Sequence, residues 1–591
     1  MDSKESSNGS DGNDFEAIDM LEAKLASLKP ILEPDDILPN KLVYQPTTIP
    51  LPEPQPPSPD LFDQLFAKFG KWQLRSILSV FVYKIPAAWF MHCILFTAPA
   101  PRYGEYFCQI PQNLSNEVNL WIDMAHPAVP DEISVQAGKK FTRDLCYVFS
   151  DANYRAEVHT TGNVSWIYDN FTDAIVPCEA HTHIDSYESI VTEFDLVCSR
   201  EILVATTQFL HLVGVSSGGT LAVILLNYIS PKKLALGGMS CMLLFGPLTG
   251  LVNRYELHVI FRLLAAMSIA HMVQAATVIS QDITVGKHRI LVTALHELFW
   301  GVGVILLPGL TFFFTSWTYL YFAMTSPALV LLLLYRYVPD SPRWHADRGH
   351  INRALKIINR FIDVDKKHDD PRIPKDLCGR LQDHANKMEK KDPGPSICVQ
   401  FRNLWKGTFI WKRNLVCVHL AISCYIVSYF GMLLNAKAFG RDRLQINTML
   451  MGVAEICGIF IGTYFIMNKG RYKWRYTAIF NIVAVCISMC AWLVPETIPE
   501  QQRISILVYI AFIPKTAIAS SLTVLVTCST EVVTADKKKI AGLSVVSCMR
   551  IFQMSTPYWG ALLMFGQLIP QTCFAVLATV GAIACLLVRV P

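Results

Sequence analysis

Charged side chains interrupt several long apolar stretches of this sequence. Arg550, Glu455, Lys515 and Glu297 each lie among apolar neighbours, and Lys84 lies in the first apolar stretch of the chain. A charged residue at the centre of a bilayer costs about 2.5 to 3.5 kcal/mol on insertion scales, so it is rarely present without a role. A guanidinium can hold a carboxylate with two hydrogen bonds, and a carboxylate can hold an ammonium group. These residues predict a site that contacts or gates a small organic ion.

His296 directly precedes Glu297. Because histidine titrates near neutral pH, the two could bind a cation or shuttle a proton, whereas the alternative for His296 is an interhelical hydrogen bond. Aromatic faces attract ammonium groups, so nearby rings could line a cavity, although packing is their commoner role. The rings considered are Phe299, Trp300, Tyr425 and Tyr429. For Lys84 the alternative is an amine that extends to the membrane surface.

The elements that position these residues must be membrane spans. Of 591 residues, 52% are hydrophobic and only 17% are charged, which is too apolar for a soluble chain of this size. A bilayer core requires about 20 mainly apolar residues per helix. This rule predicts twelve helices, near 75–97, 202–227, 234–252, 257–280, 290–314, 318–338, 414–435, 446–467, 475–494, 505–527, 541–564 and 571–589. The net charge of +4 is small and divided among loops, so it predicts no nucleic-acid partner.

The spans fall into two sets of six. We expect a proline-rich, disordered cytoplasmic tail over 1–60, a first half over 61–338, a cytoplasmic loop over 339–413 and a second half over 414–591. In the tail, apolar residues at helical spacing from Phe15 to Leu28 could form an amphipathic helix that docks a cytoplasmic partner. In the loop, Ile351, Leu355, Ile358 and Ile362 share one helical stripe and predict an amphipathic helix against the bundle.

Orientation follows from the basic residues, because Lys and Arg are retained on the cytoplasmic side during insertion. Alternate short loops carry the basic clusters, which are Lys232 with Lys233, Lys287 with Arg289, the four between Lys469 and Arg475, and Lys537 to Lys539. Both termini and the central loop are therefore predicted to be cytoplasmic, in the plasma membrane. The long loop over 98–201 is predicted to be extracellular.

The composition of that long loop agrees with an outer location. It carries three glycosylation sequons, which begin at Asn113, Asn163 and Asn170. It also holds four clustered cysteines, Cys108, Cys146, Cys178 and Cys198, as disulfide candidates. Four cysteines allow three pairings, and the sequence does not choose among them.

Similar polar and charged residues recur at the predicted cytoplasmic ends of the spans in the two sets of six. A polar residue at the membrane edge precedes a basic cluster after the second span, at Asn227, and again after the eighth, at Asn468 with Arg471. Asp282 precedes Arg289 by the same interval that separates Glu531 from Lys538. Six helices plus six helices with matching loops predict a duplicated transporter fold in which these residues latch the cytoplasmic side.

Several motifs resemble one family. These are Phe62-Asp-Gln-Leu, Ser189-Ile-Val-Thr-Glu-Phe-Asp-Leu-Val-Cys198, Pro339-Asp-Ser-Pro-Arg-Trp344, Tyr429-Phe-Gly-Met-Leu-Leu-Asn435 and Glu455-Ile. They resemble the organic cation, organic anion and carnitine transporter family, solute carrier family 22 type, of the major facilitator superfamily. The resemblance covers about residue 60 to the end. It implies a polyspecific carrier of small organic ions at the plasma membrane that hydrolyses no ATP.

The resemblance also bears on single residues. Arg550 is similar to the arginine of the family's anion and carnitine carriers, and Glu455 to a residue of its cation carriers, where Ile459 replaces a lysine of the anion carriers. Lys515 resembles a lysine common across the family, and Glu297 replaces a more usual glutamine. The latch departs from the family pattern, because Asn227 and Asn468 stand where charged residues are usual and cannot form ion pairs.

A secondary transporter is the leading interpretation, and a zwitterion such as a carnitine-like compound suits Glu455 together with Arg550. Plain organic cations or anions remain alternatives, as do a neutral-solute, sugar-like facilitator and a non-transporting receptor or scaffold. A structural ion pair of Glu455 with Arg550 or Lys515 is the alternative to substrate binding. The sequence has no His-Glu-x-x-His, Gly-x-Ser-x-Gly or phosphate-loop motif, so we expect no enzyme activity, cofactor or metal site.

Overall fold

The computed structural model describes most of the chain from Asp60 to Arg589. Residues outside the described set are 1–59, 102–103, 111–117, 130–141, 154, 156–171, 185–187, 369, 391–394, 435–442, 496 and 590–591. Three sequence-based predictions lie outside it: the helix in the tail, the glycosylation of Asn113, Asn163 and Asn170, and the motif residue Asn435.

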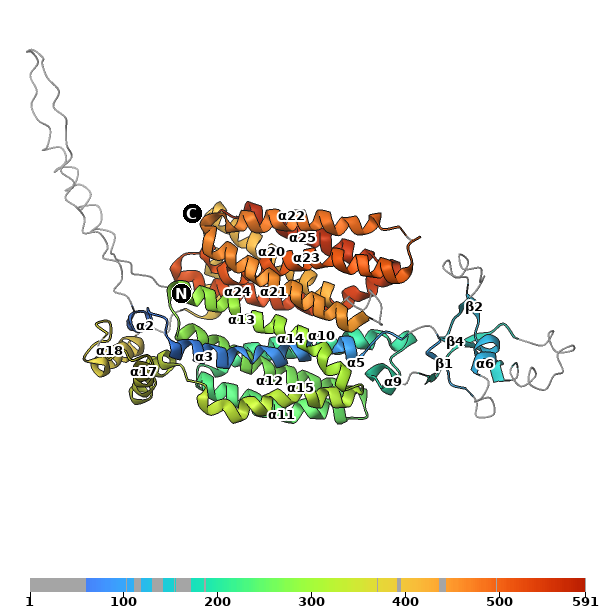
Figure 1. Ribbon diagram of the computed structural model, residues 1–591, viewed down its shortest axis with the longest axis horizontal. Helices are drawn as coiled ribbons and strands as arrows, with labels where there is room; N and C mark the ends of the chain where they lie inside the picture. The colour runs from blue at the N-terminus through green and yellow to red at the C-terminus, as the bar shows by residue number, and fades with distance from the viewer. Residues whose placement is uncertain are drawn as a thin grey trace, which may run out of the picture. The chain divides into compact units, whose positions relative to one another are not determined.

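The first half of the chain forms a bundle of long apolar helices (Figure 1). The first span is divided into α3 (Lys71–Phe81), α4 (Lys84–His92) and α5 (Ile94–Thr97), and the short α2 (Leu61–Leu65) precedes it. The other spans are α10 (Ile202–Leu225), α11 (Pro231–Leu251), α12 (Tyr255–Asp282), α13 (Gly286–His296) with α14 (Leu298–Phe313), and α15 (Trp317–Leu333) with η4 (Leu334–Tyr337). The fifth span changes helix at Glu297, so a candidate site residue lies at a break in its helix.

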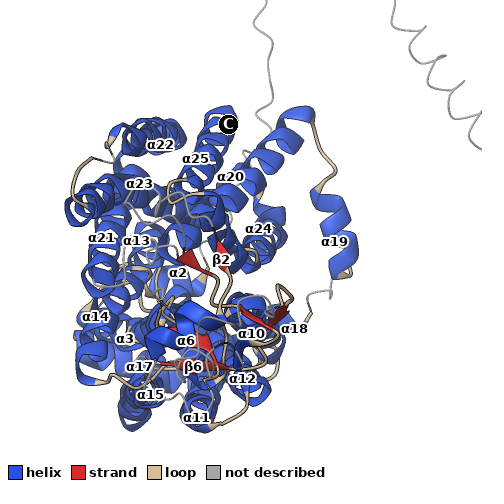
Figure 2. Ribbon diagram, turned by 90° about the vertical axis from the view of Figure 1, so that its right-hand side faces the viewer, coloured by secondary structure: helices blue, strands red, loops and turns tan. Residues whose placement is uncertain are grey.

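The second half repeats the arrangement. It consists of α20 (Phe409–Leu434), α21 (Leu444–Asn468), η7 (Gly470–Tyr472), α22 (Lys473–Met489), η8 (Cys490–Leu493), α23 (Glu500–Cys528), η9 (Ser529–Val532), η10 (Ala535–Lys537), α24 (Lys538–Met554), η11 (Thr556–Phe565) and α25 (Ile569–Leu587). In the end-on view of Figure 2, α11, α12 and α15 lie at one side of the bundle and α20, α22 and α25 at the other. The fold is the two-half, all-α membrane fold that the sequence predicts.

Ten helices of the described chain are long and apolar enough to cross a membrane. The other two predicted spans fall outside this set of ten. The helix over Trp317–Leu333 has 17 residues and falls short on length. The predicted span 541–564 is divided into α24 and η11, and Pro557 stands at the start of η11. Proline has no backbone N–H to continue the α-helical ladder, which accounts for the break.

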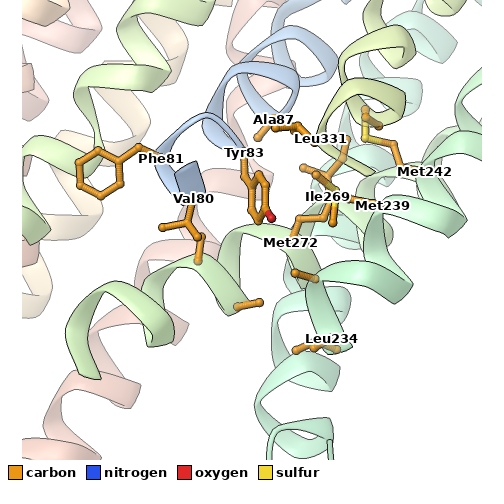
Figure 3. Close-up of a cluster of buried hydrophobic side chains, with 14 of the residues drawn as sticks. Val80, Phe81, Tyr83, Ala87, Leu234, Met239, Met242, Ile269, Met272 and Leu331 are labelled. Atoms are coloured by element: carbon orange, nitrogen blue, oxygen red, sulfur yellow. The ribbon is translucent and has the colours of Figure 1, made fainter. Parts of the chain in front are cut away.

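Two hydrophobic cores hold the bundle together. One is built mainly from helices before α16, and the other mainly from α20 to α25. Figure 3 shows part of the first, where Val80 and Tyr83 of the first span face Ile269 and Met272 of α12. Glycines permit close approach between the halves: a Cβ on Gly452 of α21 would lie 2.7 Å from Ile305 Cγ1 and 3.1 Å from the Ile305 nitrogen of α14. The fifth and eighth spans therefore pack with their backbones close together.

Four helices lie between the halves in sequence. They are α16 (Pro342–Asp347), α17 (Ile351–Asp365), α18 (Leu377–Glu389) and α19 (Ile397–Leu404). The apolar stripe predicted from the sequence forms one face of α17, where Ile351, Ile358 and Ile362 are buried and Leu355 packs against them. The charged residues of α17 lie on its other faces, as amphipathic spacing requires.

The loop between the first two spans forms small pieces of structure. Its strands pair antiparallel as β1 (Tyr106–Cys108) with β6 (His181–His183), β2 (Ala128–Val129) with β3 (Thr142–Arg143), and β4 (Tyr147–Phe149) with β5 (Ile175–Pro177). Its helices are α6 (Val118–Ala125), α9 (Ile190–Glu193) and η3 (Cys198–Arg200). Of the three possible cysteine pairings, the structure has Cys108 with Cys178 and Cys146 with Cys198. The second bond joins the residue directly before β4 to η3, which precedes α10.

Candidate functional site

The first and fifth spans bring an ion pair to the middle of the bundle. Lys84 Nζ of α4 lies 2.7 Å from Glu297 Oε1, at the junction of α13 and α14. The Lys84 side chain is 10% exposed and that of Glu297 is 39% exposed. The same ammonium lies 5.7 Å from the ring centre of Trp300. Lys84 is therefore a buried ion-pair partner rather than an amine extended to the membrane surface.

The seventh, eighth and tenth spans meet at Tyr429 of α20. Its hydroxyl donates a short hydrogen bond to Glu455 Oε1 of α21. Lys515 Nζ of α23 donates to the Tyr429 carbonyl at 3.1 Å and lies 3.4 Å from the centre of its ring. The second carboxylate oxygen, Glu455 Oε2, is buried and has no hydrogen-bond partner among the described residues. Tyr429 thus separates a carboxylate from an ammonium group and binds both.

Arg550 of α24 is the third cation of this region. It donates to Gln553 Oε1 at 3.0 Å, and no carboxylate of the described residues lies within 4 Å of it. The charge of Glu297 nevertheless acts on Arg550, and the charges of Lys84, Lys515 and Glu297 act on Glu455. We call Lys84, Glu297, Tyr429, Glu455, Lys515 and Arg550 the central charged cluster. It draws on six spans from both halves.

Other candidate residues lie beside this cluster. The His296 ring packs 4.9 Å from Phe81, and the Phe299 ring packs 5.6 Å from Phe81, so both face the first span. His296 Nε2 has no hydrogen-bond partner among the described residues, so the predicted interhelical hydrogen bond is absent on that atom. Tyr425 is fully buried against Gly581 of α25. The structure therefore brings Tyr429 and Trp300 to the charges but not Phe299 or Tyr425.

Two buried residues near the cluster were not selected from the sequence. Arg262 of α12 is 0% exposed and donates to Gln208 Oε1 at 2.8 Å, Cys93 Sγ at 3.0 Å and the Tyr321 hydroxyl. His92 of α4 is also fully buried, with its ring 5.4 Å from Trp300 and 6.2 Å from Phe430 of the second half. Arg262 lies within the predicted span 257–280. The rule that a charged residue inside an apolar span has a role, which selected Arg550, therefore applies to Arg262 as well.

A cavity of about 650 Å³ lies between the halves on the side of the disulfide-linked loop. Its lining is mainly apolar and comes from the end of the first span, the start of α10, the end of α20 and η11. Gln208, which accepts a hydrogen bond from Arg262, is one of its polar residues. A ligand that enters here contacts both halves at once.

The predicted latch residues of the first half make contacts through the Pro339–Trp344 motif. Asp282 Oδ2 accepts from Ser341 Oγ at 2.5 Å, and Ser341 Oγ in turn caps α16 by accepting from the Trp344 N–H at 2.9 Å. The Asn227 carbonyl, rather than its side chain, accepts from Arg348 Nε at 3.1 Å. This first-half junction replaces the ion pair that asparagine cannot form.

Further contacts fix the same junction. Arg289 donates to the Thr284 carbonyl at 2.8 Å and lies 3.7 Å from Asp63 of α2. Burial raises the pKa of the Asp340 carboxyl, but hydrogen bonds from His345, Ser230 and the Lys232 N–H outweigh burial and hold the pKa below its usual value. The Asp340 carboxylate is therefore held in its charged form.

In the second half, Glu531 forms an ion pair with Lys473 at 2.5 Å. Asn468 donates only to the Tyr464 carbonyl of its own helix, at 3.3 Å. Lys538 and Arg471 are exposed, and neither has an ion-pair partner among the described residues. The equal spacing of Asp282 with Arg289 and of Glu531 with Lys538 thus does not produce two matching ion pairs.

Comparisons with known proteins agree with this architecture. The sequence profile of the Major Facilitator Superfamily matches residues 201–538, more than half of the chain. The organic cation transporter protein of Drosophila melanogaster is 26% identical over 345 residues, which cover 56% of this chain and 59% of that protein. Solute carrier family 22 member 14 of Mus musculus is 26% identical over 456 residues, covering 74% of this chain and 64% of that protein. Less than two thirds of each of these two relatives is therefore matched.

Solute carrier family 22 member 3 of Rattus norvegicus is 27% identical over 455 residues, covering 74% of this chain and 77% of that protein. Among solved structures, the proton:xylose symporter XylE bound to 6-bromo-6-deoxy-D-glucose superimposes with a TM-score of 0.51 at 13% identity, covering 86% of this chain and 94% of that chain. At that identity the likeness concerns the fold alone. The superfamily that the sequence motifs predict is confirmed. The chain belongs to the Major Facilitator Superfamily and is a multi-pass membrane protein that is similar to members of solute carrier family 22.

Proposed function

We propose that this chain carries a small organic ion with a carboxylate group across the plasma membrane by alternating access. The observation that carries the proposal is the partner of each cation in the central charged cluster. Arg262 lies outside this cluster, and its guanidinium already donates to Gln208, Cys93 and Tyr321. Lys84 has Glu297, and Lys515 lies on Tyr429 close to the charge of Glu455. Among the described residues, Arg550 has the neutral Gln553 as its hydrogen-bond partner and no carboxylate within 4 Å. A guanidinium without a carboxylate partner favours a carboxylate on the substrate, which it can bind through two hydrogen bonds.

A zwitterion is the favoured substrate class. Glu455 Oε2 is buried without a hydrogen-bond partner among the described residues, and a substrate ammonium group would satisfy it. Trp300 and Tyr429 offer aromatic faces for the same group. One relative is named an organic cation transporter protein, which supports recognition of a cationic group. The sequence has no phosphate loop, so we propose that a gradient or exchange supplies the energy.

Uptake of labelled ions tests the charge assignment. Arg550→Lys keeps the charge but loses the bidentate geometry, so we expect uptake of carboxylate substrates to fall about 10-fold or more. Arg550→Asp should abolish anion uptake, and Glu455→Gln should weaken cation and zwitterion uptake while sparing simple anions. Arg353→Lys, at an exposed position of α17 outside the site and latch residues, is the matched control. Uptake is normalised to surface protein in each case.

The outcomes separate the remaining functions. An unchanged substrate profile in every variant that reaches the surface would contradict both binding roles. Uptake of sugars without any ion uptake would favour a neutral-solute facilitator. A wild-type chain that transports no member of an ion and sugar panel, with surface expression established, would favour a receptor or scaffold.

We also propose that both termini and the loop over 339–413 face the cytoplasm and that the loop over 98–201 faces outside. The basic short loops support this orientation. Tags at Ser10 and Asp392 should bind antibody only after permeabilisation. Asn113, Asn163 or Asn170 should carry glycan, which a glycosidase would remove with a shift in electrophoretic mobility. An Asp392 tag accessible on intact cells would overturn the orientation.

A further inference from the structure

A basic cleft lies where the first span meets the helices between the two halves. Its volume is about 720 Å³, and it is lined by Lys68–Lys71, Val364–Lys367 and Asp370–Arg372. The first segment leads into α3, and the other two follow the end of α17. We call these eleven residues the basic cleft. It lies outside the central charged cluster.

The basic cleft has an excess of positive charge. Five of its residues are Lys or Arg and two are Asp. Both carboxylates are already engaged: Asp365 accepts from the Trp72 N–H at 2.9 Å and lies 3.5 Å from Lys367 Nζ, and Asp370 accepts from Arg372 at 2.8 and 2.5 Å. Lys68, Lys71 and Lys366 have no carboxylate within 4 Å among the described residues. Three lysines therefore line one cleft without an ion-pair partner of their own among the described residues.

The walls of the basic cleft are fixed in place. Asp365 caps the start of α3 from 293 positions away in sequence. Gly70 makes this possible, because a Cβ there would lie 1.8 Å from Asp365 Oδ2. Lys367 Nζ donates to the Lys68 carbonyl at 2.9 Å and lies 4.2 Å from the centre of the Phe361 ring. These contacts fix the two walls of the cleft relative to each other.

An exposed apolar track begins at the basic cleft. Lys71 is the first residue of the span Lys71–Thr97. Leu74 and Leu78, three and seven positions on, share its helical face and are 49% and 45% exposed. Figure 1 shows α3 on the near side of the bundle. A ligand with a charged end in the cleft can therefore lay an apolar chain along α3.

We propose that the basic cleft binds the phosphate-bearing headgroup of an anionic phospholipid, with an acyl chain along Leu74 and Leu78. Lysines bind phosphate as point charges, and each basic residue at a membrane surface adds about five-fold to the affinity for anionic lipid. The cleft is larger than a single carboxylate needs, and its charge excess suits a headgroup with several phosphate charges. Binding fastens α17 to the start of the first span, so it favours the arrangement in which Asp365 caps α3.

Native mass spectrometry of the detergent-purified full chain tests this assignment by counting retained lipids. The probes are a phosphatidylinositol phosphate, phosphatidylserine, phosphatidylcholine and a soluble inositol phosphate. The test variant is Lys68→Gln with Lys71→Gln and Lys366→Gln, whose amines have no side-chain partner among the described residues. Retention of the phosphatidylinositol phosphate should fall about 100-fold, from three losses of about five-fold.

The matched control is Lys356→Gln with Lys387→Gln and Lys390→Gln, which removes the same charge from exposed positions of α17 and its neighbour α18. It should retain lipid like the wild type. Equal loss in both triple variants would overturn a defined site, because it would show attraction by net charge alone. Equal binding of the soluble inositol phosphate would overturn the lipid as the ligand. Binding is measured without transport, so the result is independent of the proposed substrate.

Discussion

The partners of the residues in the central charged cluster determine which of these residues a substrate can bind. Lys84 and Glu297 largely neutralise each other at 2.7 Å, and Tyr429 lies between Lys515 and Glu455. Arg550 and Glu455 Oε2 are left with unused binding capacity. The structural alternative, a direct Glu455–Arg550 ion pair, is not formed among the described atoms. A charged residue at this depth is therefore not automatically a binding residue.

Glu297 provides a test at the residue scale. Glu297→Gln leaves Lys84 buried without a counter-charge. Breaking a fully buried pair costs about 3 to 5 kcal/mol, and the cost is smaller here because solvent screens the 39% exposed Glu297 side chain. We expect surface expression and the midpoint of thermal unfolding in detergent to fall in this variant. Lys84→Met combined with Glu297→Gln removes both charges and should restore part of the loss. A double variant as unstable as the sum of its singles would contradict the pair.

The sequence predicts how deep each charged residue lies in the membrane, but it does not predict which neighbouring helix its side chain contacts. A span prediction places Lys84, Glu297 and Arg550 within the membrane, but the contact between Lys84 and Glu297 depends on how two helices are rotated against each other. For the same reason the sequence could not separate Tyr425 from Tyr429. They lie one turn apart on α20, yet Tyr425 contacts α25 and Tyr429 contacts α21. Arg262 was missed although its depth was visible in the sequence.

At the element scale, the Pro339–Trp344 motif joins four parts of the first half. Ser341 contacts the end of α12, the Trp344 indole donates to the Leu226 carbonyl after α10 at 2.7 Å, and Arg343 lies 2.8 Å from Asp60 near α2. Asp340 also accepts from the Lys232 N–H at the start of α11. These contacts explain how a chain with Asn227 at the membrane edge still holds its helix ends together.

Ser341→Ala tests this junction. The change removes the cap of α16, which is worth about 1 kcal/mol, and leaves the Asp282 carboxylate without its hydroxyl donor, which costs about 1 to 3 kcal/mol more. We expect a lower midpoint of thermal unfolding in detergent. Ser341→Thr keeps the hydroxyl and is the control. Equal stability of the alanine and threonine variants would show that the hydroxyl has no role.

The Cys146–Cys198 disulfide provides a second test at the element scale. It joins the long loop to the start of α10, and loss of such a bond usually costs about 2 to 5 kcal/mol. Cys198→Ser should therefore reduce surface expression, and Cys146→Ser should do so equally. Cys241→Ser changes an exposed free cysteine and should have no effect. Normal trafficking of both loop variants would argue against a structural role for the bond.

Element prediction succeeded where length and hydropathy are sufficient evidence. Ten of the predicted spans are recovered as long apolar helices. The division of the first span at Val82 and Tyr83 and the change from α24 to η11 were not predicted, since both depend on local backbone geometry within an apolar run. Pro557 was a visible signal for the second of these breaks.

At the scale of the whole molecule, two halves meet around a shared centre. The rings of Trp300 and His92 from the first half contact Phe430 from the second, beside the central charged cluster. The cavity of about 650 Å³ opens between the halves on the side of the disulfide-linked loop. If the halves rock against each other during transport, contacts across this cavity must change while contacts within each half persist.

A reversible cross-link between the halves tests that motion. The rings of Phe209 in α10 and Tyr558 in η11 lie 5.8 Å apart, and Tyr558 lines the cavity. Phe209→Cys with Tyr558→Cys, joined by a short reducible cross-linker, should stop uptake, and reductant should restore it, because the two helices can no longer separate. Phe245→Cys with Phe261→Cys is the control, since those rings lie 6.3 Å apart on α11 and α12 of one half. Its cross-linking should leave uptake intact, and the wild type and single variants report the effect of the native free cysteines. Full uptake by a fully cross-linked Phe209–Tyr558 pair would exclude rocking of the halves at this contact as the transport step.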